Sequence, residues 1–232
     1  MRSFLLIGQS NMAGRGELGE VPEIVNTSCF MLRNGLFRFM REPISTDRPV
    51  VAPPGCVRAG IGLGASFADA LQRHTGDEIG LVMCAEGGSS LSQWLPGQIL
   101  YDNAVAQARL AMRSSVLSGI LWHQGENDCG SPDDAKAYAG RLSRVILSLR
   151  ADLGCPRLPF LIGTLGDFVR DDPDSPYADD VNRALQEAAQ STADCALVSA
   201  AGLSCKPDGM HFTSAACRTL GERYFEAYKR FL

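Results

Sequence analysis

Five short, continuous runs of apolar residues alternate along this chain with segments whose apolar residues recur at helical spacing. The runs are 3–8, 79–84, 118–123, 158–163 and 195–199, and the helical segments are 65–73, 101–114, 133–150, 180–191 and 213–230. Strands that alternate with helices predict right-handed crossovers and a parallel sheet. Strands that are apolar throughout indicate a sheet covered by helices on both faces. We therefore expect a three-layer α/β/α sandwich.

The length and composition suit one domain over residues 1–232. The chain has 232 residues, 45% of them hydrophobic, which is enough to build a core without disulfide staples. Two strand-like runs flank Asn34-Gly35, a pair that favours a β-hairpin. Residues 41–58 contain several prolines and are expected to form an irregular surface loop. We find no repeat and no linker that would divide the chain.

Charge and hydropathy exclude two classes of partner. The net charge is −4 and no run of Lys or Arg is present, so we expect no nucleic acid. No apolar stretch approaches the roughly 20 residues that span a bilayer, so we expect no membrane association. The apolar run near the N-terminus is too short for a signal-peptide core. The chain as written is expected to be cytoplasmic, and secreted if a signal has been removed.

The cysteines do not form a recognisable framework. There are eight, at scattered positions, and no pair has CxxC spacing, which argues against a zinc ribbon or a thioredoxin-type site. Several lie in or beside apolar runs, where buried free thiols are common. We expect mostly reduced thiols.

Polar residues gather where the expected strands end. Ser10 follows the first run, Gly87-Gly88 the second, and Gln124 to Asp128 the third, while Asp208 and His211 follow the last. The carboxyl ends of parallel strands meet at one edge of the sheet, which is where such folds bind ligands. A hydroxyl, free backbone N–H groups, amides and an Asp/His pair are the parts needed for nucleophilic acyl transfer.

Each of these residues also has a structural interpretation. Ser10 stands between a strand and a helix, where a hydroxyl often serves only as a helix cap. Asp208 and His211 are spaced so that the carboxylate can fix the imidazole tautomer, but an Asp-x-x-His pair alone is a weak signal. The occurrence of the pair together with Ser10 at the same sheet edge favours a Ser-His-Asp site.

Two rival sites are weaker. Gly60, Gly62 and Gly64 resemble a phosphate loop, but no strand precedes them directly and no Walker lysine follows, so they are interpreted as a helix-entry loop. Asp208, His211 and Glu126 are conceivable metal ligands, but no dense His/Asp cluster supports this. We expect no metal and no cofactor.

Four segments together resemble a known family. They are Gly8-Gln9-Ser10-Asn11-Met12-Ala13-Gly14-Arg15, Gly87-Gly88-Ser89-Ser90-Leu91 followed by Trp94, His123-Gln124-Gly125-Glu126-Asn127-Asp128, and Asp208-x-x-His211. In this order, over nearly the whole chain, they are similar to the SGNH hydrolases. More narrowly, they resemble carbohydrate esterase family six, the acetylxylan esterase and sialate O-acetylesterase-like proteins.

The resemblance implies a flavodoxin-like sheet of five parallel strands in the order 2-1-3-4-5. It implies Ser10 as nucleophile, His211 as general base and acid, and Asp208 as the residue that orients the histidine. It further implies an oxyanion hole formed by the N–H groups of Ser10 and Gly88 and by a side-chain amide.

The third oxyanion donor is a choice between two residues. Asn127 occupies the position of the superfamily's asparagine, but related esterases often have serine there, so we expect Gln124 to donate instead. Gln9 and Glu126 are expected to support the site. Arg15, Trp94 and Trp122 are candidates for the alcohol side of the cleft, with the aromatic rings stacking on a sugar face, although each equally suits a structural role.

Three functions follow from the sequence. The favoured one is a carbohydrate O-acetylesterase acting on acetylated xylan or O-acetyl sialic acid. One alternative is a short-chain lipase or thioesterase-like SGNH hydrolase. The other is a noncatalytic carbohydrate-binding module on the same fold, which the presence of Ser10, Asp208 and His211 disfavours.

Overall fold

The computed structural model describes residues 1–46 and 59–232. Most of the expected proline-rich loop, with Cys56, therefore lies outside the described residues. The strands are β1 (Arg2–Gly8), β2 (Cys29–Arg33), β3 (Leu36–Phe39), β4 (Ile79–Met83), β5 (Val116–His123), β6 (Phe160–Gly163) and β7 (Cys195–Val198). The α-helices are α1 (Ser10–Ala13), α2 (Gly64–Thr75), α3 (Ile99–Ala111), α4 (Pro132–Asp152), α5 (Ala178–Ser191) and α6 (Ser214–Tyr228).

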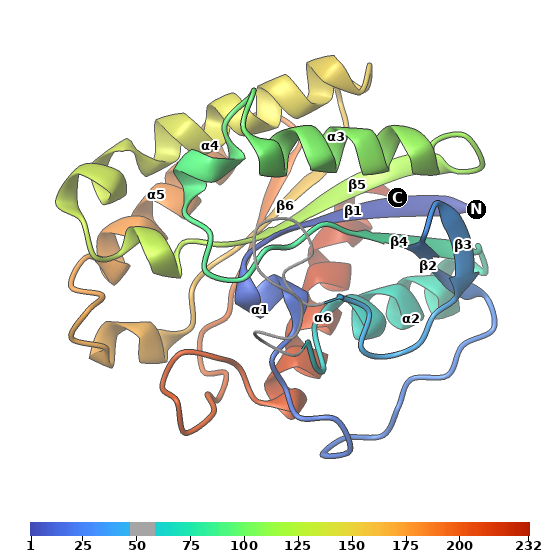
Figure 1. The fold of residues 1–232 in the computed structure, drawn as a ribbon, viewed down its shortest axis with the longest axis horizontal. Helices are drawn as coiled ribbons and strands as arrows, with labels where there is room; N and C mark the ends of the chain where they lie inside the picture. The colour runs from blue at the N-terminus through green and yellow to red at the C-terminus, as the bar shows by residue number, and fades with distance from the viewer. Residues whose placement is uncertain (47–58) are drawn as a thin grey trace.

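The described strands form one sheet in the order β3-β2-β4-β1-β5-β6-β7. Helices α3, α4 and α5 cover one face, and α2 and α6 cover the other together with the short α1 (Figure 1). Successive residues of a strand point to opposite faces. Accordingly, Leu5 and Ile7 pack under the first helix layer while Phe4 and Leu6 pack under the second. This explains the continuous apolar strands and confirms the α/β/α sandwich.

The expected sheet of five strands is extended by two. Strands β4-β1-β5-β6-β7 have the predicted order 2-1-3-4-5, and every pairing among them is parallel. The hairpin at Asn34-Gly35 forms as predicted, with φ values of 50° and 79°, as a type I′ turn requires. Its strand β2 pairs in parallel with β4, and β3 becomes an antiparallel edge strand. The hairpin signal is local, so it did not reveal that the hairpin joins the sheet.

The other expectations concern the thiols, the glycine-rich segment and the membrane. The described cysteines are all free thiols, and burial raises the pKa of Cys29, Cys84 and Cys217 to about 12, which leaves them unreactive. Gly64 is the first residue of α2, so residues 60–64 lead into a helix as predicted. Among the described residues, no helix is both long and apolar enough to cross a bilayer.

Gly8, the last residue of β1, allows the central strands to approach closely beside the polar edge. Its φ is +141°, and a Cβ there would lie 2.1 Å from the carbonyl oxygen of His123 on β5. The next residue, Gln9, donates its N–H to the same oxygen at 3.0 Å. The chain can therefore turn into α1 directly above the end of β5, which fixes the location of Ser10.

We predict that Gly8→Ala lowers the free energy of unfolding by about 3 kcal/mol or more, because it combines backbone strain with a clash against a buried carbonyl. Urea denaturation measures the loss. Gly76→Ala is the matched control: its φ is also positive, at +76°, but a Cβ there meets open space. The control should lose only about 1 kcal/mol. Equal losses in the two variants would mean that the close approach at Gly8 is unimportant.

Candidate active site

Four segments meet at the carboxyl edge of the sheet, as the sequence predicts. The short helix α1 follows β1, and Gly87-Gly88 follow β4. A 3₁₀ turn, η2 (Glu126–Asp128), follows β5, and the Asp208–His211 loop lies between β7 and α6. Thr213 caps α6 by accepting the N–H of Ala216, so the loop is anchored just beyond His211.

Ser10, His211 and Asp208 form a continuous hydrogen-bonded chain. Nε2 of His211 lies 3.0 Å from Oγ of Ser10, and Nδ1 lies 2.9 Å from Oδ2 of Asp208. A carboxylate only accepts, so Nδ1 carries the proton and Nε2 is free to accept from the serine. Ser10 is 6% exposed and His211 is half-buried. The structure thus brings the three predicted residues together in the predicted order.

Asp208 is held in its charged form. Its second oxygen accepts the backbone N–H groups of Met210 and His211 at 3.0 and 2.9 Å. Partial burial raises the pKa of Asp208, but these hydrogen bonds and the one from the imidazole outweigh burial and hold the pKa below its usual value. The carboxylate is therefore suited to orienting the histidine.

Asn11, next to the serine, clamps the loop that carries the histidine. Its side-chain NH₂ donates to the carbonyl oxygen of Met210 at 3.1 Å, and its Oδ1 accepts the N–H of Phe212 at 3.2 Å. These two bonds bracket His211 and join the loop to α1. The sequence indicates only a turn at Asn11, because the residue stands beside Ser10 between a strand and a helix.

Glu126, the first residue of η2, supports this clamp. Its Oε1 accepts from the Asn11 amide at 2.5 Å, while Oε2 is buried without a hydrogen-bond partner among the described residues. Burial raises the pKa of Glu126 above its usual range. The supporting role expected for Glu126 is therefore consistent with its contacts, which reach His211 only through Asn11.

A cleft of about 300 Å³ opens above the serine. Its walls are Gln9, Ser10, Arg15, Gly87, Gly88, Glu126, Asn127, Met210 and His211. Arg15 lies against Gly87, where a Cβ would come within 2.5 Å of the guanidinium. Of the expected alcohol-side residues, Arg15 is the one that borders this cleft. Met210 forms an apolar wall of the cleft that no sequence pattern indicated, although it stands between Asp208 and His211.

The two candidate amide donors have different surroundings. The NH₂ of Gln124 is buried and lies within 3.0 Å of Oε1 of Gln9, the carbonyl of Ser89 and Oδ2 of Asp128. Asn127 instead borders the cleft, and its NH₂ donates to the carbonyl of Gly88 at 3.0 Å. An amide has two N–H groups, so one N–H of Asn127 is left for a ligand. This arrangement favours Asn127, the reverse of the sequence-based preference for Gln124.

Gln9 joins the ends of β1 and β5. Its Oε1 lies 3.0 Å from the Gln124 amide and 3.4 Å from the N–H groups of Gly125 and Asn127, and its NH₂ lies 3.3 Å from Oδ1 of Asn127. Gln9 therefore holds the turn that presents Asn127, in agreement with the supporting role expected for it.

The prediction that the rings of Trp94 and Trp122 stack on a sugar face is wrong. Trp94 is 1% exposed and Trp122 is fully buried, and their rings pack edge to face with centroids 5.7 Å apart. Trp94 donates its indole N–H to Oγ of Ser89, which places it inside the core. Neither ring can stack on a substrate. The sequence shows that both residues are near strand ends, but not that they face the helix layer.

The rival metal site is not assembled. Asp208 and His211 are bonded to each other, and Glu126 is bonded to Asn11. In the described ranges, 1–46 and 59–232, no group of three or more His, Cys, Asp or Glu residues is arranged to hold a metal ion.

The fold and this site define the class: the protein has the fold of the SGNH-type hydrolases. Comparison with known families narrows this assignment. Residues 1–230 match the family described as carbohydrate esterase, sialic acid-specific acetylesterase, and the chain belongs to this family.

Relatives agree with the assignment. A probable carbohydrate esterase of Arabidopsis thaliana is 31% identical over 244 residues, covering 97% of this chain and 89% of the relative. The crystal structure of this same Arabidopsis protein superposes with a TM-score of 0.87 at 30% identity, covering 99% of this chain and 98% of that one. NanS has the same fold, with a TM-score of 0.78 at 18% identity over 99% of this chain and 96% of its own.

We predict that the stabilities of Glu126→Gln and the wild type diverge as pH rises. A raised pKa means that the folded protein binds this proton more tightly than the unfolded chain does. The stability that this proton contributes is present below the unfolded-state pKa and is lost as pH rises through the folded-state pKa. Glutamine keeps the neutral shape and cannot ionise. As pH rises, the free energy of unfolding of the variant should therefore increase relative to that of the wild type, by about 1.4 kcal/mol for each unit by which the folded-state pKa is raised.

Urea denaturation between pH 5 and pH 8 measures this divergence. Glu222→Gln, which alters an exposed carboxylate on α6, is the control and should follow the wild type. If the Glu126→Gln and wild-type stabilities change in parallel with pH, the buried carboxyl does not carry the proton.

Proposed function

We propose that this protein is a serine esterase that removes O-acetyl groups from a carbohydrate through an acetyl-enzyme on Ser10. The observation that carries the proposal is the chain of hydrogen bonds from Ser10 through His211 to Asp208 at the floor of a cleft. Membership of a carbohydrate esterase family supports the substrate class. The proposed substrates are acetylated xylan or O-acetyl sialic acid.

The reaction follows from the positions of the protons. Oγ of Ser10 attacks the ester carbonyl while Nε2 of His211 accepts the hydroxyl proton. Asp208 accepts from Nδ1 and stabilises the imidazolium that forms. His211 then gives the proton to the departing sugar oxygen. Water, deprotonated by the same nitrogen, attacks the acetyl carbon, and His211 returns this proton to Oγ of Ser10 as acetate leaves.

The oxyanion is proposed to form between three donors that border the cleft. They are the N–H groups of Ser10 and Gly88 and the second N–H of the Asn127 amide. Fixed donors of this kind stabilise the tetrahedral intermediate because they need no reorganisation as charge develops. The glycines at this side leave room for a small acyl group, and Arg15 is proposed to contact the sugar.

We predict that Ser10→Ala lowers kcat for p-nitrophenyl acetate by about 10³-fold or more, since the nucleophile is lost. A fluorophosphonate probe should label the wild type and leave the variant unlabelled. Ser92→Ala, at an exposed serine four residues beyond Gly88, is the control and should retain both activity and labelling.

The same assays separate the alternatives. Near-normal turnover by Ser10→Ala would exclude Ser10 as nucleophile. A wild type without esterase activity would favour a noncatalytic carbohydrate-binding module, and faster hydrolysis of octanoate than acetate esters would favour a lipase-like enzyme.

We predict that Asn127→Ala lowers kcat by about 10²–10³-fold with little change in KM, the usual cost of one oxyanion donor. Gln124→Ala should instead lower the free energy of unfolding, because it leaves several buried polar groups without partners. Measuring kcat and urea stability for both variants separates the two roles. A Gln124→Ala protein of normal stability with the larger loss of kcat would restore Gln124 as the third donor.

A further inference from the structure

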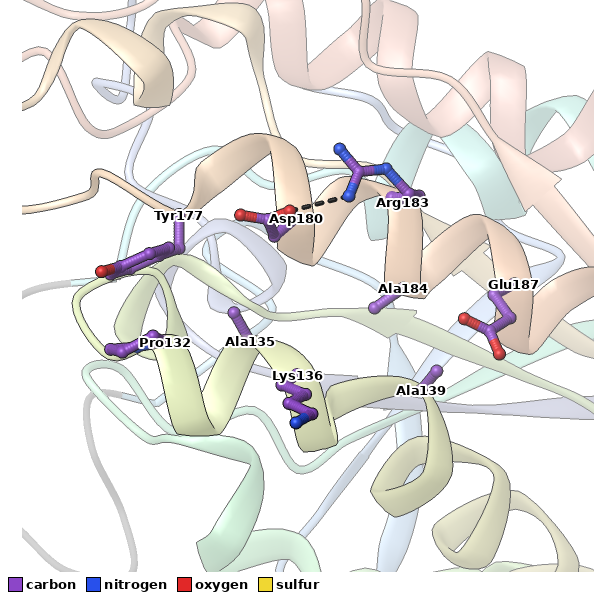
Figure 2. A pocket seen from close by; sticks show the side chains of 9 residues that line it. All are labelled: Pro132, Ala135, Lys136, Ala139, Tyr177, Asp180, Arg183, Ala184 and Glu187. Atoms are coloured by element: carbon purple, nitrogen blue, oxygen red, sulfur yellow. Dashed lines mark hydrogen bonds and ion pairs between the residues drawn. The ribbon is translucent and has the colours of Figure 1, made fainter.

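A second concave surface lies on the outer helix layer, between α4 and α5 (Figure 2). Its volume is about 360 Å³. Helix α4 lines it with residues 132, 135, 136 and 139, and α5 with residues 180, 183, 184 and 187. Each set has the spacing i, i+3, i+4, i+7, so each helix presents one continuous face to the groove. We refer to this surface as the α4/α5 groove.

Small side chains form the floor of the groove, and an aromatic ring lies at one end. Ala135, Ala139 and Ala184 lie between the two helices, where short side chains leave the space open. Tyr177 lies beside Pro132 at the end nearer the catalytic edge, and its ring is half-buried (Figure 2). A tyrosine ring with a polar tip offers an apolar face for stacking and a hydroxyl for hydrogen bonding.

The rim carries charges of both signs in equal number. Arg183 pairs with Asp180 at 2.7 Å, and Lys136 on α4 and Glu187 on α5 add one positive and one negative group (Figure 2). The formal charge of the four side chains is zero, so the groove has no net preference for an anion or a cation. It offers both donors and acceptors, which match hydroxyl groups because these donate and accept.

One end of the groove lies close to the catalytic cleft. The N–H of Tyr177 donates to the carbonyl of Cys129 at 3.0 Å, and Cys129 is two residues from Asn127, which borders the cleft. A Cβ on Gly130 would lie 3.2 Å from the carbonyl of Asp174, so the loops before α4 and α5 lie against each other. Two residues span at most about 7 Å, so the backbone of Tyr177 lies within roughly 12 Å of Asn127, about the length of two sugar units.

We propose that the α4/α5 groove binds a neutral sugar chain, the part of a polymeric substrate that extends beyond the acetylated residue in the cleft. A pyranose ring stacks its C–H face on Tyr177, and its hydroxyls bond to the paired Arg183 and Asp180 and to Lys136 and Glu187. This inference rests on the proposed carbohydrate esterase function and refines it: the substrate is a neutral polysaccharide such as acetylated xylan rather than an acidic sugar.

The kinetic test compares a polymeric with a small substrate. Tyr177→Ala removes the stacking ring, and Ala139→Trp fills the groove without removing a polar contact. Each should raise KM for soluble acetylated xylan by up to about tenfold, the value of one aromatic contact, and leave p-nitrophenyl acetate hydrolysis unchanged. Arg144→Trp places the same bulky ring on an exposed part of α4 outside the groove and should change neither substrate.

A binding test does not depend on catalysis. In native gels containing deacetylated xylan, the Ser10→Ala protein should be retarded, and adding Tyr177→Ala or Ala139→Trp should abolish the retardation. If the wild type cleaves no acetyl ester while the groove variants still lose retardation, the groove assignment stands and the proposed activity is overturned.

Three outcomes would overturn the groove assignment. They are an unchanged KM for acetylated xylan in both groove variants, an equal loss on both substrates, and wild-type mobility that xylan does not alter. Stronger retardation by polysialic acid than by xylan would overturn the choice of a neutral ligand. Since Tyr177→Ala deletes a half-buried side chain of a loop, it supplies the test if Ala139→Trp does not fold.

Discussion

The close approach of β1 and β5 at Gly8 is the constraint on which the site depends. A side chain at this position would occupy the space of the His123 carbonyl oxygen, which instead accepts the N–H of Gln9. The turn into α1 is thereby fixed over the end of the neighbouring strand. The serine hydroxyl, the Asn11 clamp and the amide of Gln9 all follow within three residues of this contact. The backbone contact between Gly8 and His123 therefore fixes where the first residues of the cleft lie.

A buried polar network holds the strand ends together. Gln9 directly follows β1 and Gln124 directly follows β5, while Asp128 from η2 also accepts the N–H of Leu91 beyond β4. The hydroxyl of Tyr138 on α4 lies 2.7 Å from both the backbone carbonyl oxygen and Oε1 of Gln124, so its one proton serves these two acceptors. Buried polar groups are costly unless paired, so a network of this kind tolerates few rearrangements. It explains why the amide-rich segment after β5 points inward at Gln124 and outward only at Asn127.

The sequence was most informative where local patterns and one topological rule suffice. Apolar runs predicted the central strands, and the convergence of parallel strand ends predicted that Ser10 and His211 would meet. It was least informative about orientation. Trp94 and Trp122 lie near the expected edge but face the helix layer, and the choice between Gln124 and Asn127 depends on the acceptors around each amide. Contacts between segments far apart in the sequence determine how β2 pairs with β4 and how wide the α4/α5 groove is. No local sequence pattern encodes such contacts.

The hydrogen bond between Ser10 and His211 joins residues 201 positions apart. A chain made from its N-terminus exposes the serine long before the imidazole exists, and the two meet only after the intervening strands have entered the sheet. Contacts of such long sequence separation are formed late, because the closure of the intervening chain must precede them. The Ser10–His211 hydrogen bond is thus coupled to completion of the fold, and a partly made or partly unfolded chain lacks it.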